Sequence, residues 1–213
     1  MTKFFAIFFL LSMMVITACS NESVKTEPAK QSEASTSNED QKTEPATTET
    51  DSNATTISDK LKSKKVLSDR VEILIPKDFE VMSEEMIAIK YPQGNPPTLV
   101  YTDNEGEVNI AFNHTTTPIE DSEIEQAKPT LKAGLESAYP DATWYRDEMT
   151  TINGKNVGVF ELITPALDTN IYNLMFFTEL DGQLLVATFN CTEELSDEWK
   201  PLAQQILQSY KVN

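Results

Sequence analysis

The side chains best able to carry chemistry in this 213-residue chain are His114, the only histidine, and Cys191, one of two cysteines. They stand in matching segments, Phe-Asn-His-Thr at 112–115 and Phe-Asn-Cys-Thr at 189–192, and an acidic stretch follows each. A cysteine nucleophile needs a base beside it and a third group that orients the base. Acidic neighbours such as those at 193–194 instead raise the pKa of a thiol. We therefore predict no catalytic residues, and an enzyme that uses an Asn/His/Cys rim stays an alternative.

The same matching segments predict a binding surface. Each ends an apolar stretch with the composition of a β-strand, so we expect the two strand ends to lie at one rim of a sheet. Polar side chains at such a rim would converge with nearby aromatic rings to form a polar, aromatic patch. The candidate binding residues are Tyr91, Tyr101, Asn113, His114 and Asn190.

Motifs for metals and cofactors are missing from the sequence. A single histidine excludes the HExxH metalloprotease motif and every multi-histidine metal site. Asp103, Glu105 and Glu107 alternate, but Gly106 is the fourth residue of that segment, and an EF-hand loop requires glycine at the sixth. Glycine-rich phosphate loops are missing as well. We therefore predict that the protein binds neither a metal nor a cofactor, and that the three acidic residues form a solvated hairpin tip. A carrier of a small ligand or cation is a second alternative for the function of the protein.

The charge balance excludes one large class of partner. The chain has 34 Asp and Glu residues against 17 Lys and Arg residues, a formal net charge of −17. Binding to nucleic acid needs a clustered basic surface. We therefore expect no nucleic-acid partner.

The N-terminal residues have the pattern of a bacterial export signal. Lys3 precedes twelve almost wholly apolar residues at 4–15, which match a signal-peptide core and are too few to span a bilayer. Ile-Thr-Ala-Cys at 16–19 follows and resembles the bacterial lipobox. The resemblance implies that residues 1–18 are a lipoprotein signal peptide and that the Cys19 thiol carries diacylglycerol. Two acyl chains attach a protein stably, so we expect a lipid-anchored protein on the extracytoplasmic side of the cell membrane.

Residues 19–58 have the composition of a linker. From residue 20 onward they contain fifteen Ser and Thr, eight acidic residues and no aromatic residue. Such a stretch buries too little apolar surface to offset the entropy lost on ordering, so we predict disorder. A flexible chain of this length reaches about 35 Å. It would hold a single domain, residues 59–213, clear of the membrane.

Turn signals and apolar periodicity predict the architecture of this domain. Asn153-Gly154 and Asp181-Gly182 predict type I′ hairpins, and we expect about eight strands, including 71–75, 86–91, 98–102 and 107–113. Helical spacing predicts helices over 123–139 and 195–210. Pro129 should kink the first helix or restart it with the proline in the first turn.

The late strands decide how these elements are layered. Residues 171–180 and 184–189 are apolar on both faces, so their sheet needs cover on both faces. The two helices are the available covers. The predicted fold class is α+β, an antiparallel β-sheet flanked by helices on both faces in an α/β/α sandwich.

Several segments carry a family resemblance. They are Val-Glu-Ile-Leu-Ile-Pro at 71–76, Ile-Lys-Tyr-Pro at 89–92, Val-Asn-Ile-Ala-Phe-Asn-His at 108–114, Asn-Gly-Lys at 153–155 and Glu-Trp-Lys-Pro at 198–201. Together they resemble the Mog1/PsbP-like superfamily, especially its small bacterial lipoproteins. The resemblance implies a binding module but assigns no functional residue. We therefore expect a non-catalytic interaction module whose partner is an envelope or extracellular protein.

Overall fold

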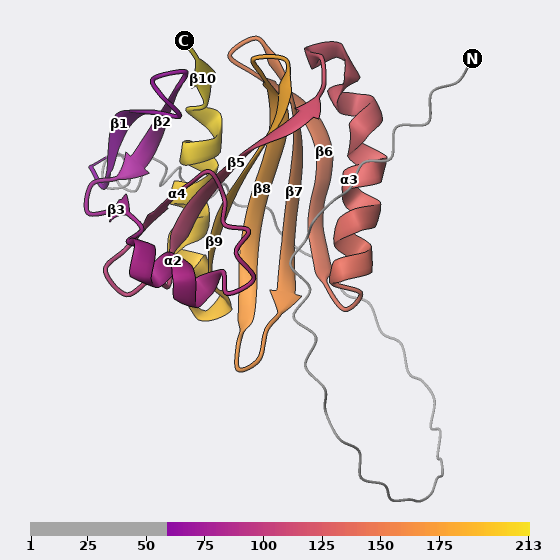
Figure 1. The fold of residues 1–213 in the computed structure, drawn as a ribbon. Helices are drawn as coiled ribbons and strands as arrows, with labels where there is room; N and C mark the ends of the chain where they lie inside the picture. Colours follow the sequence, from indigo (N-terminus) through magenta and orange to yellow (C-terminus); the bar gives the residue numbers. More distant parts are fainter. Residues whose placement is uncertain (1–58) are drawn as a thin grey trace, which may run out of the picture.

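The computed structural model describes residues 59–213, so the predicted signal peptide, Cys19 and the linker lie outside the described residues. The main feature is a seven-stranded sheet in which every neighbouring pair is antiparallel (Figure 1). Its strands, in spatial order, are β3 (Glu80–Val81), β4 (Leu99–Thr102), β5 (Asn109–Pro118), β9 (Gln183–Thr192), β8 (Asn170–Leu180), β7 (Lys155–Pro165) and β6 (Thr143–Ile152).

The two predicted hairpins are confirmed. Asn153 and Gly154 join β6 to β7 with φ values of 48° and 84°, and Asp181 and Gly182 join β8 to β9 with φ values of 52° and 74°. A type I′ turn requires positive φ at both central residues, and Asn-Gly and Asp-Gly accept it at low cost.

Both predicted helices are present, as α3 (Ile124–Ala138) and α4 (Ser196–Gln208), and each follows a single 3₁₀ turn, at Asp121–Glu123 and Glu193–Leu195. α3 passes through Pro129 at its sixth position, so it does not restart there. Pro129 and Glu125, whose carbonyl loses its helical donor, are both exposed to water. Within residues 59–213, no helix has the length and apolar character needed to cross a bilayer.

One predicted strand is wrong, because residues 86–91 belong largely to a short helix, α2 (Glu84–Lys90). Ser83 Oγ accepts a hydrogen bond from the backbone N of Met86, at 3.2 Å, and so caps the helix. Acidic residues at 84 and 85 favour the positive end of the helix dipole. Met86 and Ile87 then pack on Val100 and Ala111 of the sheet.

Alternating side chains of the central strands form two separate cores, as the sequence predicted. On one face, Val159 and Leu174 share a buried cluster with Leu202 of α4. On the other, Phe160 and Phe177 pack with α3. The large sheet is therefore covered by helices on both faces, and the predicted α/β/α layering is confirmed.

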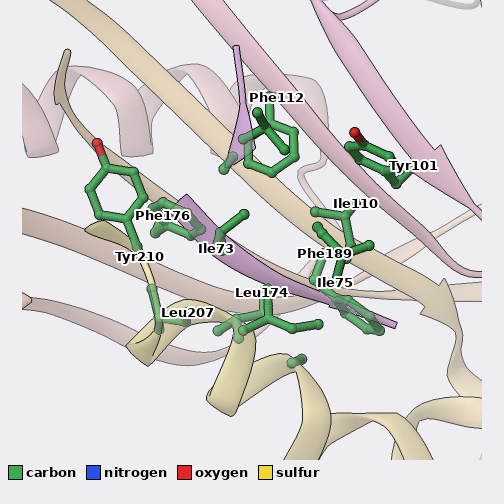
Figure 2. Close-up of a cluster of buried hydrophobic side chains, with 14 of the residues drawn as sticks. Ile73, Ile75, Tyr101, Ile110, Phe112, Leu174, Phe176, Phe189, Leu207 and Tyr210 are labelled. Atoms are coloured by element: carbon green, nitrogen blue, oxygen red, sulfur yellow. The ribbon is translucent and has the colours of Figure 1, made fainter. Parts of the chain in front are cut away.

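A second, three-stranded sheet completes the cover on the α4 side. It has the order β1 (Leu61–Val66), β2 (Val71–Pro76), β10 (Lys211–Val212), and the sequence did not predict it as a separate unit. Figure 2 shows Ile73 and Ile75 of β2 within the cluster formed by the large sheet and α4. Seven strands span about 29 Å, whereas a helix is about 10 Å wide. One helix cannot cover that face, and the small sheet covers the rest.

Substitution of Gly158 in β7 would test how closely the core between the sheet and α3 is packed. A Cβ atom at this position would lie 1.9 Å from Cζ of Phe177, a fully buried ring. We predict that Gly158→Ala lowers the free energy of unfolding by about 2–3 kcal/mol in urea denaturation, because the buried ring would have to shift within the core. Combining it with Phe177→Leu should cost less than the sum of the two single changes. Wild-type stability of Gly158→Ala would contradict the close packing.

Asp147 in β6 ties that edge strand to α3. Its carboxylate accepts hydrogen bonds from Lys128 Nζ at 2.6 Å and Lys132 Nζ at 2.7 Å. These two bonds, that from Lys128 first, lower the pKa of Asp147 below its usual value. A lowered folded-state pKa stabilises the fold above the unfolded-state pKa, and this stability is lost as the pH falls through the folded-state pKa.

We predict that Asp147→Asn lowers the free energy of unfolding by about 1 kcal/mol at pH 7. The difference from wild type should shrink as the pH falls from about 4, the unfolded-state pKa, through the lowered folded-state pKa of Asp147, below which the wild-type carboxylate is neutral as well. Urea denaturation of both chains across this range measures it. A difference that does not change with pH would show that the ion pairs contribute nothing.

Candidate functional site

A cleft of about 470 Å³ opens on the face of the large sheet that carries α2 and α3. Its floor is formed by side chains of β5, β8 and β9, and the loops after α2, after β4 and after β7 surround it. Tyr91, the C-cap residue of α2, and Tyr139, the C-cap residue of α3, both line it. The cleft therefore lies where both covering helices end and the sheet beneath them stays open.

Three asparagines form the floor of the cleft, and we call them the amide row: Asn109, Asn190 and Asn173. Asn190 in β9 pairs with Asn109 in β5 on one side and with Asn173 in β8 on the other. Side chains at paired positions of adjacent strands point to the same face. The strand register thus places three amides in a line across the middle of the sheet.

Hydrogen bonds hold the amide row in place. Asn109 Oδ1 accepts a bond from Thr102 Oγ1 at 2.8 Å, and its Nδ2 donates to Asn190 Oδ1 at 3.0 Å and to Gly106 O at 3.2 Å. Asn173 Nδ2 donates to Thr164 Oγ1 at 3.1 Å and to the backbone carbonyl of residue 171 at 3.0 Å. Both donors of each of these two amides are therefore occupied.

The amide row keeps one donor and one acceptor without a hydrogen-bond partner in the described residues. Within residues 59–213, Asn190 Nδ2 and Asn173 Oδ1 make no hydrogen bond, although both residues line the cleft and are half-buried. An amide nitrogen is a donor and an amide oxygen is an acceptor. The floor consequently offers both functions side by side.

The walls give the cleft its electrostatic character. One wall contains Lys90, whose Nζ donates a hydrogen bond to the carbonyl of Gly106 at 2.5 Å. The ammonium group of this wall is therefore already bound to the backbone. Glu105 and Glu107 line the same wall and are exposed. Burial raises the pKa of Tyr91, so its phenol stays neutral. The Glu105 and Glu107 carboxylates have no such backbone partner in the described residues, so their negative charge makes the cleft unfavourable for anions.

The predicted hairpin tip at residues 103–107 borders this wall. Asp103 Oδ1 accepts a hydrogen bond from the backbone N of Glu107 at 2.9 Å, and Gly106 takes a positive φ of 78°. The Asp103 carboxylate therefore shapes the turn. Throughout the described domain, no three His, Cys, Asp or Glu side chains are grouped so as to hold a metal ion.

The structure places some of the predicted binding residues in the cleft and the others away from it. Tyr91 and Asn190 both line the cleft. Tyr101 is buried on the opposite face, where Lys64 Nζ lies 4.4 Å from its ring centroid. Asn113 lies four positions along β5 from the amide row, about 13 Å away, and His114 lies one position further.

The expectation that the two matching segments meet at one rim is wrong. β5 and β9 are adjacent antiparallel strands, so their C-terminal ends point to opposite ends of the sheet. The spacing along the strands puts His114 about 20 Å from Cys191. His114 Nε2 lies 3.0 Å from the carbonyl of Leu180, and Cys191 is only 1 % exposed. The two side chains do not form a catalytic pair.

The pKa of Cys191 is raised, as predicted, but for a different reason. Burial raises it to about 12, and Lys200 lowers it only partly. The neighbouring acidic residues at 193–194 are not the cause. At physiological pH the thiol stays protonated beneath the surface.

The sequence did not predict that three residues of the cleft, Asn109, Asn173 and Tyr139, belong to a binding site. The two asparagines interrupt apolar stretches, and a polar residue in such a stretch is a usable signal for a functional face. Asn190 pairs with Asn173, 17 positions away, and with Asn109, 81 positions away. The predicted Asp181-Gly182 hairpin fixes the first pairing, but no local pattern carries the second.

Comparisons with known proteins establish the fold. No protein-family model and no curated protein sequence matches the chain. Cyanobacterial PsbP (CyanoP) from Synechocystis sp. PCC 6803 has a similar structure, with a TM-score of 0.53 and 16% identity over 72% of this chain and 93% of that one. This confirms the predicted PsbP-like fold. At such low identity the likeness concerns the fold alone.

Two further structures are more distant. LpqN, involved in cell envelope biogenesis of Mycobacterium tuberculosis, matches with a TM-score of 0.48 and 12% identity, over 76% of this chain and 96% of that one. A protein of unknown function from Pseudomonas aeruginosa matches with a TM-score of 0.44 and 11% identity, over 72% and 97%.

The burial of Cys191 can be tested with a thiol reagent. In a Cys19→Ser chain Cys191 is the only thiol, and we predict that it reacts with a disulfide reagent at least 100-fold more slowly than after unfolding in urea. Burial and the raised pKa both suppress the thiolate. Fast reaction in the folded chain would show that Cys191 is accessible and would contradict its burial.

Proposed function

We propose that this protein is a lipid-anchored, extracytoplasmic binding module of the bacterial cell envelope, which recognises its ligand in the cleft and does no chemistry on it. The observation that carries the proposal is the amide row on the cleft floor. Asparagine amides neither titrate nor act as nucleophiles at physiological pH. A floor built from them suits recognition.

Two segments that border the cleft expose large apolar side chains. Ile89 and Leu167 are 72% and 76% exposed, and they adjoin the cleft-lining residues Lys90 and Ala166 in the chain. Large apolar side chains that stay exposed are typical of interaction surfaces when they gather in a patch. We therefore favour a component of the envelope, of which one segment occupies the cleft. A small soluble ligand, the carrier alternative, is supported by the cleft volume, which lies in the range of small-molecule sites.

The N-terminal sequence supports the location. The lipobox-like segment at 16–19 would attach the chain through diacylglycerol on Cys19, and the linker would let the domain reach about 35 Å from the membrane. The domain has 26 acidic and 13 basic side chains, a net charge of −13. That charge keeps it away from anionic lipid surfaces and leaves the cleft free to meet other components.

Photo-crosslinking in intact bacterial cells tests both parts of the proposal. A photoreactive residue replaces Glu107, on the cleft wall, or Asn113, which is exposed on the same sheet face outside the cleft. We expect a crosslinked product from position 107, and at most a fifth as much from position 113. Cys19→Ser should move the chain from the membrane fraction to the soluble fraction and reduce the product.

Two results would contradict the proposal. Equal crosslinking from positions 107 and 113 would show that the cleft is not the binding surface. Mass spectrometry of the wild-type chain from the membrane fraction tests the lipid anchor. An unmodified Cys19, or a chain that retains residues 1–18, would show that the anchor does not exist.

A further inference from the structure

We infer that the ligand of the cleft is a neutral saccharide, held by hydrogen bonds from its hydroxyl groups to the amide row. The inference rests on the proposed function and gives the cleft a ligand class. Its basis is the pair of free polar atoms on the floor, Asn190 Nδ2 and Asn173 Oδ1. One hydrogen bond, from Asn109, holds the Asn190 amide, and two hydrogen bonds of its Nδ2 hold the Asn173 amide, so the pair is preorganised.

A saccharide matches this pair chemically. A hydroxyl group both donates and accepts hydrogen bonds. Neighbouring hydroxyls on one sugar ring can therefore satisfy a donor and an acceptor that lie on adjacent strands, where Cβ atoms are about 5 Å apart. A ligand that leaves either amide atom unpaired loses affinity, because both atoms give up water when the cleft fills.

The aromatic walls suit a sugar ring. Tyr91 and Tyr139 are half-buried and come from the ends of two different helices. A tyrosine has an apolar ring face and a polar tip. The ring faces can pack on the C–H surface of a sugar.

The charges of the cleft exclude anionic sugars and phosphates. Glu105 and Glu107 line the wall, and Lys90 is committed to the Gly106 carbonyl. The C-terminal ends of α2 and α3, where helix dipoles are negative, also face the cleft through Tyr91 and Tyr139. A neutral ligand avoids this repulsion.

The position of the amide row also disfavours an extended peptide. Peptides that bind to sheets commonly add a strand at a free edge. Here β9 and its two neighbours lie inside the seven-stranded sheet, where their backbone groups are already paired. The available contacts are side-chain amides and aromatic rings.

Isothermal titration of the full-length chain in detergent, with defined probes, tests the inference. The probes are the tetramer of N-acetylglucosamine, maltotetraose, tetra-alanine and inorganic phosphate. We expect at least one of the two neutral saccharides to bind, and the peptide and phosphate not to bind.

Two aspartate variants then locate the site. Asn190→Asp keeps the Oδ1 that accepts from Asn109 but removes the donor that faces the cleft, so saccharide binding should weaken at least tenfold. Asn113→Asp makes the same chemical change on an exposed residue of the same sheet face and should leave binding unchanged. Tyr139→Ala should weaken binding, and Tyr139→Phe, which keeps the ring, should restore most of it. Thermal unfolding of each variant checks that it is folded.

Three outcomes would overturn the inference: no saccharide binding by the wild-type chain, equal affinities for Asn190→Asp and Asn113→Asp, or binding of the peptide alone. If crosslinking at position 107 still succeeds, the cleft is a binding site for another ligand class and the proposed function stands. If that crosslinking also fails, both proposals fall together.

Discussion

The structure depends on one constraint: the central strands of the large sheet are apolar on both faces and need cover on both. α4 and the small sheet satisfy this on one face. On the other, α3 and α2 cover the two sides of the sheet with separate clusters. Between the ends of these helices the strands become polar, since the positions that would need cover carry the amide row. The cleft is thus the part of that face which its sequence leaves open to water.

Strand register turns this opening into an organised site. Three asparagines distant in the chain stand in one row because β5, β9 and β8 pair at Asn109, Asn190 and Asn173. The hydrogen bond from Thr102 on β4 extends the row by one more strand. Because the row lies in the interior of the sheet, each of its strands is paired on both sides. Shifting any one amide would disturb the backbone hydrogen bonds to both neighbouring strands. A ligand therefore meets groups that are already fixed, which lowers the entropic cost of binding.

The same register separates the side chains that are chemically most reactive. Antiparallel pairing sends the ends of β5 and β9 in opposite directions, and Cys191 is covered by α4 and the small sheet. The thiol is part of the core, where burial keeps it protonated. What gathers at the open face is a set of neutral amides and tyrosines with two carboxylates on the wall. That distribution of groups is the physical basis for the binding role that we propose.

Much of the fold was determined by the sequence, because hairpins and amphipathic helices depend on nearby residues. Asn153-Gly154 and Asp181-Gly182 specify their turns locally, and apolar spacing specifies α3 and α4. The strand predicted at residues 86–91 was wrong because it overlooked local helix signals, the N-cap Ser83 and the acids after it. The rim prediction failed because it treated two similar segments as neighbours in space. Only the tertiary structure decided which strand ends meet, that Asn109 aligns with Asn190 and Asn173, and where the helices stop, since these depend on contacts between residues far apart in the chain.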